Sequence, residues 1–345
     1  MDEARRGVAE IRLPLAKASP SDTTGMDVVK ITRLMGISLA AALLAVPGVA
    51  AARGGKIALT FDDLPALTLL PDQPYVDYLN ATILRKLRQH HLRAIGFVNQ
   101  GKVEELVRDR QVANLERWLK AGMDLGNHTF SHESANAIGA TAYIADIVRG
   151  EPVIRRLLAE RGRRIVWFRH PYLETGYPPP AQREIDAWLQ AHGYRIAPVT
   201  IDADDWEFAE PYDDAIARHD AAAQHRIMAE YLAHSAKQID WSQRSARVLF
   251  GRDIAQVMLL HCTRLNADAL DALAALLRHA HLRSVDLAEA LRDPVYRLPD
   301  HYAGKDGIGW LERWAIDRHR DLPDGDEDPP ADIKAAYDRV DNDQR

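Results

Sequence analysis

Two patterns of apolar residues alternate along most of the chain. Short, dense apolar runs are typical of buried strands, whereas apolar residues three or four positions apart are typical of helices. The predicted strands cover 57–61, 94–98, 123–128, 164–169, 194–201, 257–262 and 283–285. The predicted helices cover 75–90, 112–121, 142–160, 181–192, 267–280 and 287–291. This alternation predicts an α/β fold in which helical crossovers join parallel strands, as either an open sheet or a barrel.

Two further regions fall outside this alternation. An Ala- and His-rich stretch over 207–250 predicts an insertion of one or two helices that covers one side of the domain. Residues 293–345 form a C-terminal extension, in which we expect 294–318 to pack on the domain and the acidic 321–345 to be largely mobile. The sequence thus predicts a main domain over 53–292, with an insertion and an extension.

The beginning of the chain has the pattern of a targeting segment. Residues 1–25 are polar without a sustained period, and we interpret them as an extension upstream of a start at Met26. Residues 26–52 combine a charged start, an apolar run and small residues at the end, which is typical of a secretory signal peptide. The apolar run over 34–46 is short for a bilayer span, and an uncleaved membrane anchor is the alternative. We therefore expect an exported protein, either periplasmic or secreted.

The net charge indicates which kinds of partner the protein binds, and the cysteine content indicates whether disulfides stabilise its fold. The net charge is −6 over 345 residues, which argues against nucleic acid as the main partner because phosphate binding needs a basic surface. Cys262 is the only cysteine, so the chain forms no intramolecular disulfide and its fold must rest on its core or on a metal. No obligate protein partner is evident.

Polar clusters follow the predicted strands at the points where the strands end. In parallel sheets and barrels, binding sites collect at the carboxyl ends of the strands. We therefore expect these clusters to converge on one face of the domain. They are 62–63, 128–132, 169–172, 202–206 and His261.

Three of these side chains form a candidate metal site. His128 and His132 are four residues apart, and on one helical turn both would point from the same face toward one cation. Asp63 completes a set of two imidazoles and one carboxylate, which is typical of catalytic zinc and of some other divalent metals. Asp62 and Asp63 leave a strand in different directions, so one would bind the metal while the other faces the substrate. An exposed turn is the alternative for this pair.

The five clusters together resemble the five ordered motifs of the polysaccharide deacetylase family, the NodB-like carbohydrate esterases of family 4. The resemblance covers roughly residues 56–292. It implies a distorted (β/α) barrel with fewer than eight complete units, which agrees with the alternation of strands and helices. The motifs are TFDD at 60–63, HTFSH at 128–132, RHPY at 169–172, DADDW at 202–206 and LLH at 259–261.

By this resemblance, Asp63, His128 and His132 would hold Zn²⁺ or another divalent metal such as Co²⁺, Ni²⁺ or Mn²⁺. Asp62 would be the general base. Arg169 would pair with this base and orient it.

The remaining roles implied by the resemblance concern the leaving group and the acetyl group. The backbone N–H of Tyr172 would help to hold the oxyanion. Asp205 would hydrogen-bond His261 and keep it protonated as the general acid. Trp206 and Leu259 would wall the pocket for the acetyl methyl.

The chemistry of these residues fits the hydrolysis of an amide. A bound Zn²⁺ would activate water and polarise the carbonyl, and a separate acid would protonate the leaving amine. We expect removal of N-acetyl groups from an amino-sugar polymer or oligomer, such as peptidoglycan or chitin-like material. One alternative is an O-acetyl esterase acting on a decorated polysaccharide such as xylan. Another is a non-catalytic carbohydrate-binding protein of the cell envelope.

The sequence departs from the family pattern at two positions beside the motifs. Leu64 stands where the family commonly has glycine, and Cys262 stands where an acidic residue is frequent. We do not expect Cys262 to act as a nucleophile, because neighbouring strand residues point to opposite faces and His261 could not serve as its base. We expect six other histidines to be surface or packing residues: His170, His219, His225, His234, His279 and His281.

Overall fold

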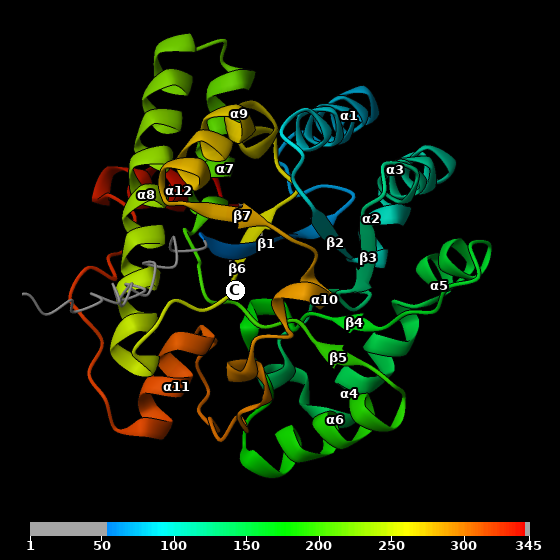
Figure 1. The fold of residues 1–345 in the computed structure, drawn as a ribbon. Coiled ribbons are helices and arrows are strands. Elements are labelled where there is room, and N and C mark those ends of the chain that lie inside the picture. Colours follow the sequence, from blue (N-terminus) through cyan, green and yellow to red (C-terminus); the bar gives the residue numbers. More distant parts are fainter. Residues whose placement is uncertain (1–53, 342–345) are drawn as a thin grey trace, which may run out of the picture. The chain divides into compact units, whose positions relative to one another are not determined.

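A sheet of seven parallel strands lies at the centre of the described chain, which covers residues 54–341 of a computed structural model (Figure 1). The strand order is β5-β4-β3-β2-β1-β6, and β7 pairs with β1. This parallel order confirms the predicted α/β class. The strands are β1 (Gly55–Leu64), β2 (Ala94–Val98), β3 (Asp124–Asn127), β4 (Trp167–Phe168), β5 (Arg195–Ile196), β6 (Gln256–His261) and β7 (Leu282–Ser284).

Alternation along β1 separates two apolar clusters. Ile57, Leu59 and Phe61 belong to the larger cluster, which also contains side chains of α1 (Gln73–Gln89), α3 (Arg108–Lys120) and α9 (Arg264–His279). Ala58 belongs to a second cluster, with residues from β2, β4 and β6. Because successive strand residues point to opposite faces, β1 is buried on both sides.

The sheet closes on itself through the segment that follows β5. Ile201 forms a parallel bridge with Met258 of β6, and the amide of Leu259 donates to the Ile201 carbonyl at 2.9 Å. The runs 164–169 and 194–201 were predicted as full strands, but only two residues of each belong to β4 and β5. Their pairing is short because the chain leaves β5 and crosses toward β6. The result is the distorted barrel that the resemblance implies.

The remaining helices cover the barrel and extend from it (Figure 1). The predicted insertion over 207–250 corresponds to α7 (Asp205–Ala217) and α8 (Ala221–Phe250), which pack against each other. The predicted helix over 142–160 is two helices, because Pro152 begins the second one. The others are α2 (Gln100–Glu104), α4 (Ala135–Arg149), α5 (Pro152–Ala159), α6 (Pro179–Ala191), α10 (Leu287–Ala290), α11 (Trp310–Arg318) and α12 (Ala331–Val340), with the 3₁₀ turns η1 (Pro171–Leu173) and η2 (Pro294–Arg297).

The C-terminal extension packs on the domain further than the sequence predicts. Leu311 and Trp314 of α11 are buried in a cluster with Trp241 of α8, as expected for 294–318. The prediction of a largely mobile 321–345 is wrong for α12, because Ile333 is buried in the apolar cluster of α7 and α8. The acidic composition of the segment obscures this short amphipathic helix.

The predicted N-terminal extension over 1–25 and the predicted signal peptide over 26–52 lie outside the described residues. Within 54–341, no helix has the length and apolar character required to cross a bilayer.

Candidate metal and catalytic site

The end of β1 places two carboxylates in different directions. Asp62 continues the strand and pairs in register with His261 of β6. Asp63 has a left-handed backbone with φ of 60°, so its side chain leaves the regular alternation. Both carboxylates are buried, with exposed fractions of 2% and 4%. The alternative of an exposed Asp-Asp turn is therefore wrong.

The loop after β3 brings His128 and His132 together. The expected helical turn is wrong, since this segment is irregular and Thr129 and His132 have φ of 64° and 57°. Asp146 of α4 accepts the amides of Phe130 and Ser131 at 3.2 and 2.9 Å, and thereby holds the loop in this shape. The two imidazole rings lie with their centroids 4.9 Å apart.

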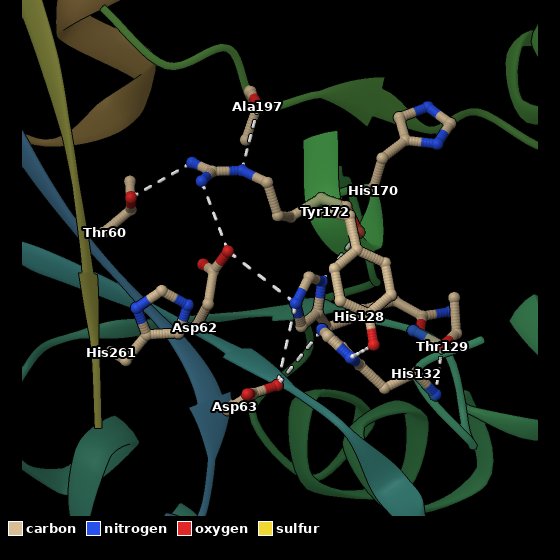
Figure 2. A network of polar contacts seen from close by, with 12 residues as sticks. Thr60, Asp62, Asp63, His128, Thr129, His132, His170, Tyr172, Ala197 and His261 are labelled. Atoms are coloured by element: carbon tan, nitrogen blue, oxygen red, sulfur yellow. Dashed lines mark hydrogen bonds and ion pairs between the residues drawn. The ribbon is translucent and has the colours of Figure 1, made fainter. Parts of the chain in front are cut away.

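Three ligand atoms face one another at this point (Figure 2). Asp63 Oδ1 lies 3.7 Å from His128 Nε2 and 3.6 Å from His132 Nε2. Ligand atoms about 2.1 Å from a tetrahedral cation lie about 3.4 Å from one another, so these spacings match a single ion. Asp63 Oδ1 is buried and has no hydrogen-bond partner among residues 54–341. The three residues therefore fit a divalent cation.

The other nitrogen of each ring fixes its orientation. His128 Nδ1 lies 2.8 Å from the carbonyl oxygen of Arg169, and His132 Nδ1 lies 3.1 Å from the hydroxyl of Tyr172. Such contacts are typical of metal-binding histidines, because they select the tautomer that presents Nε2 to the ion. Burial lowers the pKa of His132 to about 3, so its ring is neutral at pH 7, as a metal ligand must be.

The charge of Asp63 suits the same role. Burial acts to raise the pKa of this carboxyl, but His132, Lys102 and His128 together outweigh burial and hold it below its ordinary range. Asp63 is therefore ionised at neutral pH. Within 54–341, these three residues are the one cluster of three His, Cys, Asp or Glu side chains close enough to share an ion.

Asp62 is held by a buried arginine instead. Arg169 Nη1 donates to Asp62 Oδ2 at 3.3 Å, Nη2 donates to Thr60 Oγ1 at 3.0 Å, and both charged groups are buried. Arg169 Nε donates to the Ala197 carbonyl at 3.1 Å, which fixes the guanidinium plane. Asp62 Oδ1 is buried without a hydrogen-bond partner among the described residues. Asp62 Oδ2 also lies 3.7 Å from His128 Nε2, so this carboxylate stands beside the metal-ligand set.

His261 is bonded to a second carboxylate, Asp205. Its Nδ1 lies 2.7 Å from Asp205 Oδ1, and its backbone amide donates to Asp205 Oδ2 at 2.7 Å. Burial acts to lower the pKa of His261, but Asp205, with smaller contributions from Asp63 and Asp62, raises it to about 9. His261 is therefore a cation at pH 7, and its Nε2–H is available to donate a proton.

The structure also places the three predicted pocket residues. Leu259 is buried with Leu173 and Val199 in a small apolar cluster. Trp206 packs edge-on against Tyr337 of α12, with ring centroids 5.0 Å apart. Tyr172 lies in η1 with φ of 56°, and its ring contacts that of His132 at a centroid distance of 4.6 Å.

Several supporting residues were not predicted from the sequence. Asn266, near the start of α9, donates to both Asp205 and the carbonyl of His261. Asp146 anchors the histidine loop from α4. Neither belongs to a motif, and their only signal is a polar residue that is fully or almost fully buried, at 0% and 3% exposure. The burial of a polar residue depends on the tertiary structure, so it cannot be predicted from the neighbouring sequence.

The two departures from the family pattern have structural explanations. The side chain of Leu64 fills the space over Gly96 of β2, where an added Cβ would lie 2.3 Å from Leu64 Cδ2. Cys262 is buried, with its thiol 3.2 Å from the Pro65 carbonyl, and burial raises its pKa. A protonated, buried thiol agrees with the expectation that Cys262 is not a nucleophile.

Among the histidines expected to be surface or packing residues, His170 and His234 are buried. His170 Nδ1 lies 3.1 Å from the hydroxyl of Tyr143, and burial lowers its pKa to about 3. The ring of His234 packs near that of Phe208. Neither histidine belongs to the cluster of Asp63, His128 and His132.

Comparison with known proteins identifies relatives of the chain. It is 28% identical over 155 residues to a peptidoglycan-N-acetylglucosamine deacetylase of Bacillus cereus, a match that covers 44% of this chain and 46% of the relative. It is 27% identical over 161 residues to a chitin deacetylase of Colletotrichum lindemuthianum, covering 46% of this chain and 55% of the relative. The chain thus spans about half the length of the curated relatives it matches.

A solved structure and a family model match as well. A polysaccharide deacetylase of Bacillus cereus has a TM-score of 0.47 and 20% identity, covering 67% of this chain and 91% of that one. The family model described as polysaccharide deacetylase matches residues 50–197, which include Asp62, Asp63, His128, His132 and Arg169. Residues 50–197 of the chain are therefore similar to the polysaccharide deacetylase family.

Proposed function

We propose that the protein is a metal-dependent hydrolase that removes N-acetyl groups from an amino-sugar polymer or oligomer. The observation that carries this proposal is that the metal-ligand set lies beside a buried carboxylate paired with Arg169, that of Asp62, and a protonated imidazole, His261. A binding protein would not need these groups together. Peptidoglycan and chitin-like polymers are the proposed substrates, because the curated relatives are named for them.

We propose Zn²⁺ as the cation held by Asp63, His128 and His132, because two imidazoles and one carboxylate form a donor set typical of catalytic zinc. The same donors also accept Co²⁺, Ni²⁺ and Mn²⁺. When bound, the cation supplies a Lewis acid for the acetyl carbonyl and lowers the pKa of a water to about 7.

Asp62 acts as the general base in this proposal. Its Oδ1 is buried and has no hydrogen-bond partner among the described residues, so we assign this oxygen to accept a proton from the attacking water, while Arg169 holds Oδ2. The water oxygen bonds to the acetyl carbon, and the developing oxyanion is held with help from the backbone N–H of Tyr172. Leu259 and Trp206 would contact the acetyl methyl, as the resemblance implies.

His261 completes the reaction by protonating the leaving nitrogen. An amine is a poor leaving group unless it is protonated, and the ion pair with Asp205 keeps the imidazole charged for this step. The C–N bond breaks as the proton moves from His261 to nitrogen, which yields acetate and a free amine. The cleaved acid ionises to acetate, Asp62 loses its proton to solvent, and His261 regains a proton from solvent. Ester cleavage needs the same base but less help from the acid, so O-deacetylation of a polysaccharide such as xylan is the second candidate.

We further propose that the protein is exported and that its mature form begins just after residue 50 or 52. The support is the pattern of charged, apolar and small residues over 26–52.

The first prediction separates the roles of two neighbouring carboxylates. Apoprotein titrated with Zn²⁺ in competition with a chromophoric chelator should bind one ion. Asp63→Asn should weaken binding by about 100-fold, because a charged ligand is lost, whereas Asp62→Asn should change it by less than about threefold. Equal loss in the two variants would contradict the assignment of Asp63 as ligand and Asp62 as base.

The second prediction concerns acetate release from three substrates: N-acetylglucosamine oligomers, peptidoglycan and acetylated xylan. We expect release from an amino-sugar substrate that a chelator abolishes, and a loss of about 10² to 10⁴ in kcat for Asp62→Asn because the base is removed. Release from xylan alone would replace the proposal with the esterase. No release from any substrate by zinc-loaded protein would remove the catalytic proposal.

The third prediction concerns the pH profile of kcat. His261 must be protonated, so activity should be retained below its pKa of about 9 and fall as the pH rises through that value. Asp205→Asn removes the main group that raises this pKa, and should move the alkaline limb to lower pH by about one unit or more. Asp204→Asn is the matched control and should leave the limb in place. An unmoved limb in Asp205→Asn would show that another group governs it.

The fourth prediction concerns processing. N-terminal sequencing of protein recovered from the periplasm or medium after expression in a bacterium should begin at Ala51 or Arg53. A full-length chain retained in the membrane fraction would instead support the uncleaved anchor over 34–46.

A further inference from the structure

A buried arginine connects the C-terminal extension to the site. Arg313 of α11 is 1% exposed, although it lies outside the segment matched by the family model. Its Nη2 donates to the Leu173 carbonyl at 2.8 Å, Nη1 donates to Asp300 Oδ2 at 2.8 Å, and Nε donates to the Ile308 carbonyl at 3.0 Å. A buried guanidinium is costly unless its N–H groups are paired, so these contacts fix its position. Its flat face lies 4.3 Å from the ring centroid of Trp310.

The loop that Arg313 binds has an unfavourable backbone conformation. Tyr172 and Leu173 are consecutive left-handed residues, each with φ of 56°. Residues with a Cβ rarely adopt this conformation, and it persists where surrounding contacts impose it. Arg313 binds the Leu173 carbonyl, while Gly307 passes so close to the Tyr172 carbonyl that an added Cβ would lie 1.6 Å from its oxygen. The extension therefore contacts both left-handed residues.

The same extension is attached to the barrel at points around this loop. The amide of Trp310 donates to the Val199 carbonyl at 2.7 Å, and Val199 shares its apolar cluster with Leu173 and Leu259. The side chain of Gln182 donates to the Tyr302 carbonyl at 2.8 Å. Trp310 and Tyr302 thus attach the extension to the barrel beside the apolar cluster of Leu173, Val199 and Leu259.

The left-handed loop in turn contacts a metal ligand. The hydroxyl of Tyr172 lies 3.1 Å from His132 Nδ1, and its ring stands edge-on to the imidazole (Figure 2). A partner on the distal nitrogen fixes the ring of a metal-binding histidine. The contacts therefore run from Arg313 through Leu173 and Tyr172 to His132.

We propose that Arg313 is a positioning residue for the metal site, acting by holding Tyr172 against His132. The C-terminal extension is then part of the functional unit, and residues 53–292 alone would form an incomplete site. The kinetic consequence of this proposal rests on the proposed function, whereas its consequence for metal binding does not.

A double-mutant cycle on Zn²⁺ affinity tests the proposal without any substrate. The full-length apoprotein, Arg313→Met, Tyr172→Phe and the double variant are each titrated against a chromophoric chelator. Tyr172→Phe and Arg313→Met should each weaken binding by about 10-fold. The double variant should bind about as weakly as the weaker single variant, because both changes remove the same support.

Arg318→Met is the matched control on the same helix. Arg318 donates to the Leu249 carbonyl at 3.3 Å and lies over Phe250. Both of these partners lie outside the Tyr172 loop, so removal of Arg318 should leave zinc affinity within twofold. Wild-type affinity in Arg313→Met or Tyr172→Phe, or equal losses in Arg313→Met and Arg318→Met, would overturn the proposal. The proposal would also be overturned if the loss of zinc affinity in the double variant equalled the product of the losses in the two single variants.

A second variant covers the case in which Arg313→Met does not fold. Gly307→Ala leaves Arg313 in place and displaces the Tyr172 carbonyl, so it should also weaken zinc binding, and unchanged affinity there would count against the proposal. Where the wild-type enzyme releases acetate, Arg313→Met should lower kcat more than it raises KM. If the wild-type enzyme releases none, the proposed function fails, and the zinc cycle still decides the role of Arg313.

Discussion

The buried guanidinium of Arg169 is the interaction on which the site depends. Its three nitrogens donate hydrogen bonds to Asp62 and Thr60 on β1 and to the Ala197 carbonyl just after β5. Arg169 therefore links two strands that are separated by three others in the sheet. The backbone carbonyl of Arg169 also orients the ring of His128. A buried charge must keep its partners, because an uncompensated charge in the interior is strongly destabilising. The position of the candidate base and the orientation of one ligand are therefore set by the same residue.

Two opposite charges are kept apart in this site, and each has its own partner. Arg169 stabilises the carboxylate of Asp62, whereas Asp205 stabilises the cationic form of His261. Asp62 and His261 lie on neighbouring strands in register, so the fold brings a base and an acid to one place while their partners favour opposite charges. The geometry of parallel strands thus supplies the proximity, and the two ion pairs supply the chemistry.

The sequence predicts the parts of this arrangement that depend on local pattern. The strands that carry Asp62 and His261 were predicted because their apolar runs are continuous, and the motifs identified the polar residues at their carboxyl ends. The conformation of the loop from His128 to His132 was predicted incorrectly, because the left-handed backbone of Thr129 depends on a distant anchor, Asp146. The contact between Arg313 and the Leu173 carbonyl could not be predicted either, since the two residues lie far apart in the chain and no motif includes them.

The most direct test of the account is anomalous diffraction at the zinc edge from crystals of zinc-loaded protein. The account predicts a strong peak bonded to Asp63 Oδ1, His128 Nε2 and His132 Nε2, with Asp62 outside bonding distance and paired to Arg169. A peak within bonding distance of Asp62 in place of Asp63 would contradict the assignment of Asp63 as the ligand and Asp62 as the base. Zinc bound elsewhere, with these three residues unoccupied at saturating metal, would contradict the assignment of the site itself.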